Sequence, residues 1–114
     1  MKKIKAGFRG NKFNIEAREL SLPGQFIGLM FKSRETDSLL FNRGGRWSIH
    51  SFFVFFPFLA LWLDEKNNVL EYKIVKPFTS YVQPKSKFAK LVEIPINEKN
   101  NKIIEAFEKW TAKR

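Results

Sequence analysis

The stretch Ile4–Ala17, IKAGFRGNKFNIEA, decides the fold. Apolar and polar residues alternate on both sides of Gly10-Asn11, a pattern typical of two half-buried strands joined by a two-residue turn. On the outer face of such a hairpin, Lys5 should lie across from Glu16 as an opposite-charge pair. The same turn predicts three apolar pairs on the core face: Phe8 with Phe13, Ala6 with Ile15, and Ile4 with Ala17.

The pattern of strands continues downstream of this hairpin. Apolar residues occupy both parities between Phe52 and Leu63, which is typical of a strand covered on both faces, and Pro57 should mark a break or an edge. The expected elements are a short helix from Ser21 to about Met30, a strand at 39–41, strands through 47–63, a hairpin pairing 59–64 with 69–75, and a strand at 88–96. We therefore expect a mainly β fold, a β-sandwich or half-open barrel, with one short internal helix.

The C-terminal segment, residues 97–114, has the pattern of an amphipathic helix. Asn97 is a suitable cap, and acidic and basic side chains recur four residues apart. Apolar side chains occur at helical spacing and should dock the helix on the sheet: Ile103, Ile104, Phe107 and Trp110.

Composition places the chain among single small domains, residues 1–114 forming one unit. The absence of cysteine excludes disulfides, thiolate metal sites and cysteine nucleophiles, and fits a reducing compartment. The basic N-terminus is not followed by the apolar run of an export signal. The apolar run Phe52–Leu63 is shorter than the ~20 residues of a membrane-spanning helix. We expect a soluble, cytoplasmic protein with no membrane contact.

Three sequence blocks resemble DUF family 192, a family of unknown function. They are residues 28–32 with 38–41 (GLMFK and SLLF), residues 49–54 with Pro57-Phe58-Leu59 and Leu63-Asp64, and Lys76-Pro77 with 91–95 (LVEIP), Tyr81 lying between. The chain is similar to the variants that carry His in the second block. The resemblance implies a β-sandwich or half-open barrel with one short helix, and it implies no activity.

The chain also departs from the family pattern. Gln25 stands where Arg is usual, Ser51 replaces Met, and Leu59 replaces Asp. The glycine-rich ending of the family is missing, and the C-terminal helix stands in its place. A family site that depended on the Arg or the Asp would be lost here.

The residue content gives little support for catalysis or for a cofactor. His50 is the one histidine, so paired-histidine metal motifs are excluded, and a lone strand histidine is usually a packing residue. Neighbouring strand residues point to opposite faces, so Ser51 should not meet His50. The acid pairs Asp64-Glu65 and Glu35/Asp37 fall in expected turns. We expect no enzyme activity, no cofactor and no metal.

The net charge of +10 leaves two binding hypotheses open. In the first, a polar or anionic ligand or a protein partner binds beside His50 and the connection from Lys76 to Lys87. In the second, the basic and aromatic stretch 73–90 binds single-stranded nucleic acid by phosphate neutralisation and base stacking. The alternative to this second hypothesis is that the lysines only form a solvated face while the aromatic rings pack into the core. The candidate ligand-binding residues are His50, Lys76, Tyr81, Lys85 and Lys87.

Overall fold

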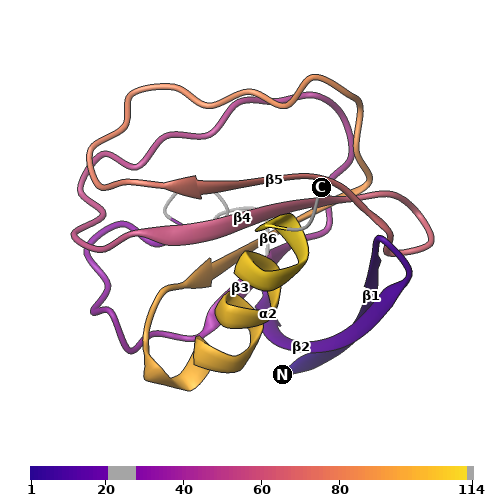
Figure 1. Ribbon diagram of the computed structural model, residues 1–114. Helices are drawn as coiled ribbons and strands as arrows, with labels where there is room; N and C mark the ends of the chain where they lie inside the picture. Colours follow the sequence, from indigo (N-terminus) through magenta and orange to yellow (C-terminus); the bar gives the residue numbers. More distant parts are fainter. Residues whose placement is uncertain (21–27, 113–114) are drawn as a thin grey trace.

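The computed structural model describes residues 1–20 and 28–112. In this part of the chain six strands form one curled sheet, and a helix follows at the C-terminal end (Figure 1). The elements are β1 (Lys2–Phe8), β2 (Asn11–Glu19), β3 (Ser38–Phe41), β4 (Phe58–Leu63), β5 (Val69–Val75), β6 (Lys90–Pro95), a 3-10 turn (Glu98–Asn100) and α2 (Asn101–Ala112). The sheet curls as a half-barrel, which confirms the mainly β fold class.

The N-terminal hairpin forms with the predicted core face, but its register differs by two residues. The turn is Arg9-Gly10 rather than Gly10-Asn11, so Phe8 lies opposite Asn11 and not opposite Phe13. Both turn residues have positive φ, 50° at Arg9 and 82° at Gly10, as a twist-matched two-residue turn requires. Tertiary contacts favour Arg9 here, because its guanidinium lies 4.9 Å from the Phe8 ring centre and donates to the Trp110 carbonyl at 3.1 Å.

A two-residue shift keeps every side chain on its face, so the predicted core side of the hairpin is correct. The apolar pairs become Ala6 with Phe13 and Ile4 with Ile15. The outer face pairs Lys3, and not Lys5, with Glu16.

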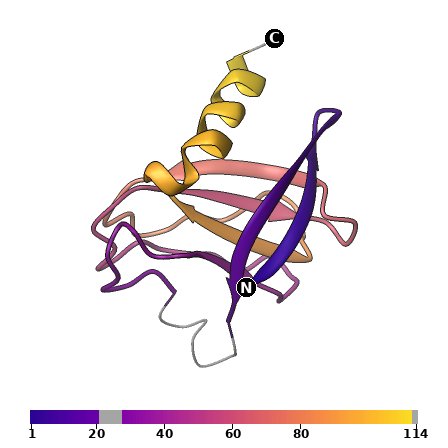
Figure 2. The same ribbon diagram turned by 90° about the horizontal axis from the view of Figure 1, so that it is seen from below.

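The sheet order is β1-β2-β3-β6-β4-β5, with β2 and β3 parallel and the other neighbours antiparallel. Strand β4 is buried along its whole length, as its apolar residues at both parities predicted. Leu59, Leu61 and Leu63 face one core with the helix, whereas Phe58 and Trp62 face a second core beneath the long connections. Figure 2 shows α2 on one side of the strands and these connections on the other.

The C-terminal helix is capped and docked as predicted. The Asn97 side chain accepts from the Asn100 backbone N–H at 3.0 Å. Ile104 and Phe107 are buried, and the Phe107 ring stacks on Phe8 with centroids 4.9 Å apart. The helix therefore covers the hairpin and closes the first core.

Two predicted elements differ from the structure. Residues 47–57 are not strand: Ile49 makes an isolated bridge to Val82, and Pro57 precedes β4 directly. The reason is that this segment exposes most of its phenylalanines in turns instead of burying them. Of the short helix expected at 21–30, residues 21–27 lie outside the described part, and Gly28–Phe31 form a turn. Within residues 1–20 and 28–112, no helix is both long and apolar enough to cross a membrane.

Candidate functional site

A pocket of about 240 Å³ opens between the sheet and its long connections. Its floor is Glu93, which projects from β6 toward the second core. Gly28 lies above the carboxyl group, where a Cβ atom would come within 3.7 Å of one carboxyl oxygen and 3.5 Å of the Phe41 ring. The other described lining residues come from the turn at 29–30 and from the connection that follows β3: Leu29, Met30, Arg43, Trp47, Ser48, Ile49, His50, Val54 and Phe58.

Glu93 is an acid placed in an apolar strand. Only 5% of the residue is exposed, and burial raises the pKa of its carboxyl to about 8. No residue that the structure describes donates a hydrogen bond to it. A buried polar group without a partner costs free energy, about 1–3 kcal/mol in mutational studies. Among the described residues, Glu93 is therefore a buried acid with no hydrogen-bond partner, and it lines a pocket.

Burial, and not a neighbouring charge, raises the pKa of this carboxyl group and favours its uncharged form near neutral pH. Arg43 lines the pocket with its guanidinium carbon 5.2 Å from the Trp47 ring centre. A neutral carboxyl group presents one O–H donor beside one carbonyl acceptor. The site is therefore suited to a planar group that carries an acceptor next to a donor.

Ser48, His50 and Glu93 line the same pocket, which raises the question of a catalytic triad. No hydrogen bond joins any two of them. The His50 Nδ1 atom accepts from the Phe52 backbone N–H at 3.2 Å, so it cannot donate to Glu93 as the base of a triad would. The three side chains can contact one ligand, but they are not arranged for nucleophilic catalysis.

Of the predicted site residues, His50 alone lines this pocket. It is exposed and lies outside any strand, so the expectation of a packed strand histidine is wrong. The backbone bends at residues 50–53, which turns the imidazole outward.

The remaining predicted residues lie in the connection after β5, which is bonded to the segment that carries His50 through the bridge of Ile49 to Val82. None of their side chains lines the Glu93 pocket. The Lys76 side chain is exposed, and the Tyr81 hydroxyl bonds to Gln83. The Lys85 backbone N–H donates to the Glu71 carboxylate at 2.8 Å, and Lys87 lines a separate, shallow hollow.

Ser51 has a structural position that explains why it does not meet His50. Its side chain is fully buried, donates to the Lys76 carbonyl at 2.5 Å and accepts from the Thr79 N–H at 2.6 Å. Its backbone also bonds to Thr79 and Phe78. Ser51 thus fixes the connection before β4 against the connection after β5.

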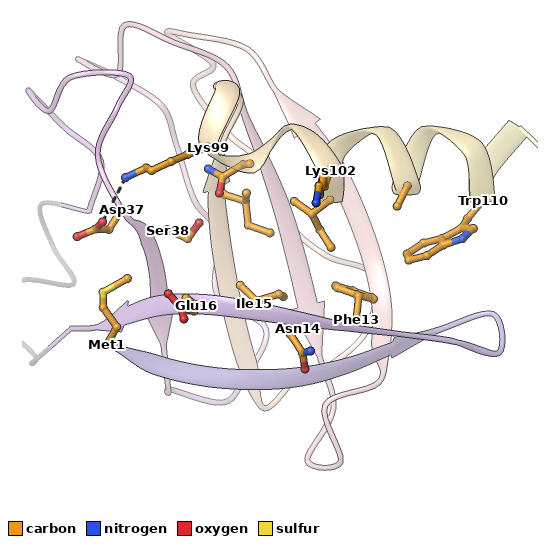
Figure 3. A pocket seen from close by; sticks show the side chains of 14 residues that line it. Met1, Phe13, Asn14, Ile15, Glu16, Asp37, Ser38, Lys99, Lys102 and Trp110 are labelled. Carbon is orange, nitrogen blue, oxygen red and sulfur yellow. Dashed lines mark hydrogen bonds and ion pairs between the residues drawn. The ribbon is translucent and has the colours of Figure 1, made fainter.

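A larger hollow, about 590 Å³, lies between the hairpin and α2 (Figure 3). Phe13, Ile15 and Trp110 contribute apolar surface to it, and its two acidic residues are ion-paired, Asp37 with Lys99 at 3.3 Å and Glu16 with Lys3 at 3.9 Å. The Arg18 hydrogen bond to Asp37 lowers the pKa of that carboxyl. Because its acids are paired, this hollow has no feature comparable to the buried Glu93 carboxyl group.

Glu93 is the residue that the sequence analysis overlooked. Glu93 is the single acid in the apolar stretch LVEIP. Because acids are rarely buried without a partner, an acid in such a strand is a recognisable sign of a binding or catalytic group.

Comparison with known proteins shows the fold and nothing finer. No protein-family model and no curated protein matches the chain. A crystal structure of a protein of unknown function from Novosphingobium aromaticivorans has a TM-score of 0.72 at 11% identity, covering 88% of this chain and 76% of its own. A crystal structure of a “putative transcription regulator” from Sinorhizobium meliloti has a TM-score of 0.67 at 12% identity, covering 80% and 76%.

Proposed function

We propose that this chain is a non-catalytic binding domain that holds a small polar ligand in the Glu93 pocket. The observation that carries the proposal is the buried, unpartnered carboxyl group at the floor of a cavity. A ligand that bonds to it recovers the hydrogen bonds that the fold leaves unmade. The pocket is smaller than the ~300–1,000 Å³ typical of drug-sized ligands, so the bound group is no larger than one or two fused rings.

The position of the pocket adds support. The three blocks that resemble DUF family 192 each contribute to its lining: Leu29 and Met30 from the first, His50 and Val54 from the second, and Glu93 from the third. Membership of that family is part of the proposal, and the pocket would then be the feature that its motifs have in common.

Glu93→Gln and Glu93→Leu form a matched pair for testing the proposal. The amide of Gln offers the same acceptor and donor as a neutral carboxyl group, whereas Leu offers neither. In a thermal-shift screen of small amides, lactams and nucleobases, compounds that stabilise the wild type should also stabilise the Gln variant and not the Leu variant. Equal stabilisation of all three proteins, or of none, would contradict the proposal.

Single-stranded nucleic-acid binding through residues 73–90 is a second candidate, favoured by one observation. Phe78 and Tyr81 are exposed beside exposed lysines, so only Phe88 of the three interleaved rings packs inward. The name of the Sinorhizobium meliloti neighbour is compatible with this candidate, although that likeness shows the fold alone.

A salt titration with a labelled single strand tests it. Replacing Lys85 and Lys87 by Gln should flatten the log–log dependence of affinity on salt by about 1.4, at about 0.7 per phosphate. An unchanged slope would show that these lysines only solvate the surface.

A further inference from the structure

Four phenylalanine side chains form an exposed cluster beside the Glu93 pocket, which we call the aromatic cluster. Phe31 comes from the turn after Gly28, Phe53 and Phe55 from the connection before β4, and Phe78 from the connection after β5. Their exposed fractions are 68%, 48%, 58% and 51%. The rings touch one another in a row: the centroids of Phe31 and Phe53 lie 5.1 Å apart, those of Phe53 and Phe78 6.5 Å, and those of Phe78 and Phe55 5.4 Å.

The backbone holds this cluster in an unfavourable conformation. Phe31, Phe53 and Phe78 all have φ near +60°, a region in which a bulky L-residue is destabilised by about 1 kcal/mol or more. Hydrogen bonds impose it, since the Phe31 N–H donates to the Phe53 carbonyl and the Phe78 N–H to the Ser51 carbonyl, each at 2.9 Å. Strained residues of this kind gather at binding and catalytic sites, and large exposed apolar patches mark contact surfaces.

The cluster and the pocket share two segments of the chain. Leu29 and Met30, which line the pocket, directly precede Phe31, and Val54 lines it between Phe53 and Phe55. The rings themselves lie outside the pocket lining, so a ligand would have to extend beyond the pocket to contact them.

The charge around the cluster is positive on every side along the chain. Between Ser38 and Leu63, and between Tyr72 and Val92, the sequence contains no acidic residue. Lys32 follows Phe31, and Lys76 lies two residues before Phe78, both with exposed side chains. Exposed rings bordered by lysines favour a partner that carries flat apolar groups on an anionic chain.

We infer that the aromatic cluster and the Glu93 pocket together bind single-stranded nucleic acid, with bases stacked on the phenylalanine rings and one base inserted in the pocket. Every nucleobase carries a donor beside an acceptor on its Watson–Crick edge, which complements an uncharged Glu93 carboxyl group. Lys32 and Lys76 contact the phosphates. This inference rests on the proposed ligand pocket and specifies the class of its ligand.

Fluorescence anisotropy of the full chain with a labelled single strand of about 12 nucleotides tests the inference. Phe53→Ser and Phe78→Ser should each weaken binding about 5- to 150-fold, the effect of losing one stacked base, without changing the salt slope. Lys76→Gln should instead flatten the slope by about 0.7. Leu70→Ser is the matched control, because this apolar side chain of β5 is similarly exposed but lies outside both the cluster and residues 73–90, and it should leave binding unchanged.

Two control probes distinguish binding through base stacking from binding through negative charge alone. A strand of the same length that lacks bases keeps its phosphates and should bind far more weakly. If it binds as well as the complete strand, or if phosphatidylserine vesicles bind and the phenylalanine variants abolish only that binding, the inference is wrong.

The Glu93 variants separate this inference from the proposed function. Glu93→Gln should bind the strand like the wild type, and Glu93→Leu should bind it more weakly at an unchanged salt slope. A small amide that requires Glu93, together with no strand binding, would overturn the inference and leave the pocket assignment standing. Strand binding that depends on Phe53 but not on Glu93 would overturn the insertion of a base in the pocket, and with it the inference, while the thermal-shift screen still decides the proposed function.

Discussion

Glu93→Gln should make the protein more stable at neutral pH, and the size of the gain follows from the burial of the carboxyl group. The pKa of Glu93 is about 8 in the folded protein and 4.5 in its ordinary state. Below pH 4.5 the folded and unfolded chains both hold this proton, so Glu93 contributes no pH dependence. Between pH 4.5 and 8 only the unfolded chain releases it, and the free energy of unfolding falls by about 1.4 kcal/mol per pH unit.

The free energy of unfolding lost at pH 7 is therefore about 3 kcal/mol, and the loss reaches about 5 kcal/mol above pH 8. Gln cannot ionise, yet it keeps the acceptor and donor of the neutral acid. The two proteins should have equal stability near pH 4.5, and the variant should become progressively more stable as the pH rises. Urea unfolding followed by tryptophan fluorescence at half-unit intervals from pH 4.5 to 8.5 measures this difference.

Arg43 and His50 are the other charged or titratable groups that line the pocket among the described residues, and both remain in the variant. Asp37→Asn is the matched control. The Arg18 hydrogen bond lowers the pKa of Asp37, so its contribution is present above pH 3.8 and is lost only as the pH falls below it. The difference in the free energy of unfolding between Asp37→Asn and the wild type should be constant from pH 5 to 8. A constant difference for Glu93→Gln as well would show that Glu93 is ionised in the folded protein and refute the reasoning.

Three further substitutions test the fold by urea unfolding. Phe107→Ala should cost about 3–5 kcal/mol, because the ring is buried, and Trp110→Ala should cost less, because that side chain is partly exposed; equal costs would contradict this packing. Ser51→Ala should cost about 1–3 kcal/mol, since the buried Thr79-to-Ser51 hydrogen bond is lost, and an unchanged midpoint would mean that water replaces it. Gly10→Ala should cost about 1–2 kcal/mol at φ +82°, whereas no cost would contradict a left-handed conformation at Gly10.

The sequence predicted those features that depend on local pattern. Alternation placed both strands of the N-terminal hairpin and its core face, and helical spacing placed Ile104 and Phe107 against the sheet. The register was wrong because it depends on a distant contact: Arg9 occupies a left-handed turn position where its guanidinium reaches the carbonyl of Trp110, 101 residues away.

The site was harder to predict for a physical reason. A run such as Phe52-Phe53-Val54-Phe55-Phe56 is equally compatible with a strand buried on both faces and with turns that expose most of the rings. The structure has the second arrangement, with Val54 and Phe56 buried and Phe52, Phe53 and Phe55 exposed. What distinguishes the two is Ser51, whose hydrogen bonds to the connection after β5 bend the chain, and no local pattern in the sequence reveals those partners.

Glu93 and the aromatic cluster have one energetic property in common. At each place a different residue would make the free protein more stable: an amide at position 93, or glycine where Phe31, Phe53 and Phe78 adopt positive φ. Arg9 and Asn67 also have positive φ, but three of the five non-glycine positive φ values among the described residues belong to phenylalanines of the cluster, and Glu93 is the one buried acid. Instability concentrated in one place is expected where a ligand supplies the missing hydrogen bonds and covers the exposed rings. A ligand that does both should raise the midpoint of unfolding of the wild type and of Glu93→Gln by similar amounts near pH 7, because the folded wild type already holds the carboxyl proton and Gln offers the same donor and acceptor.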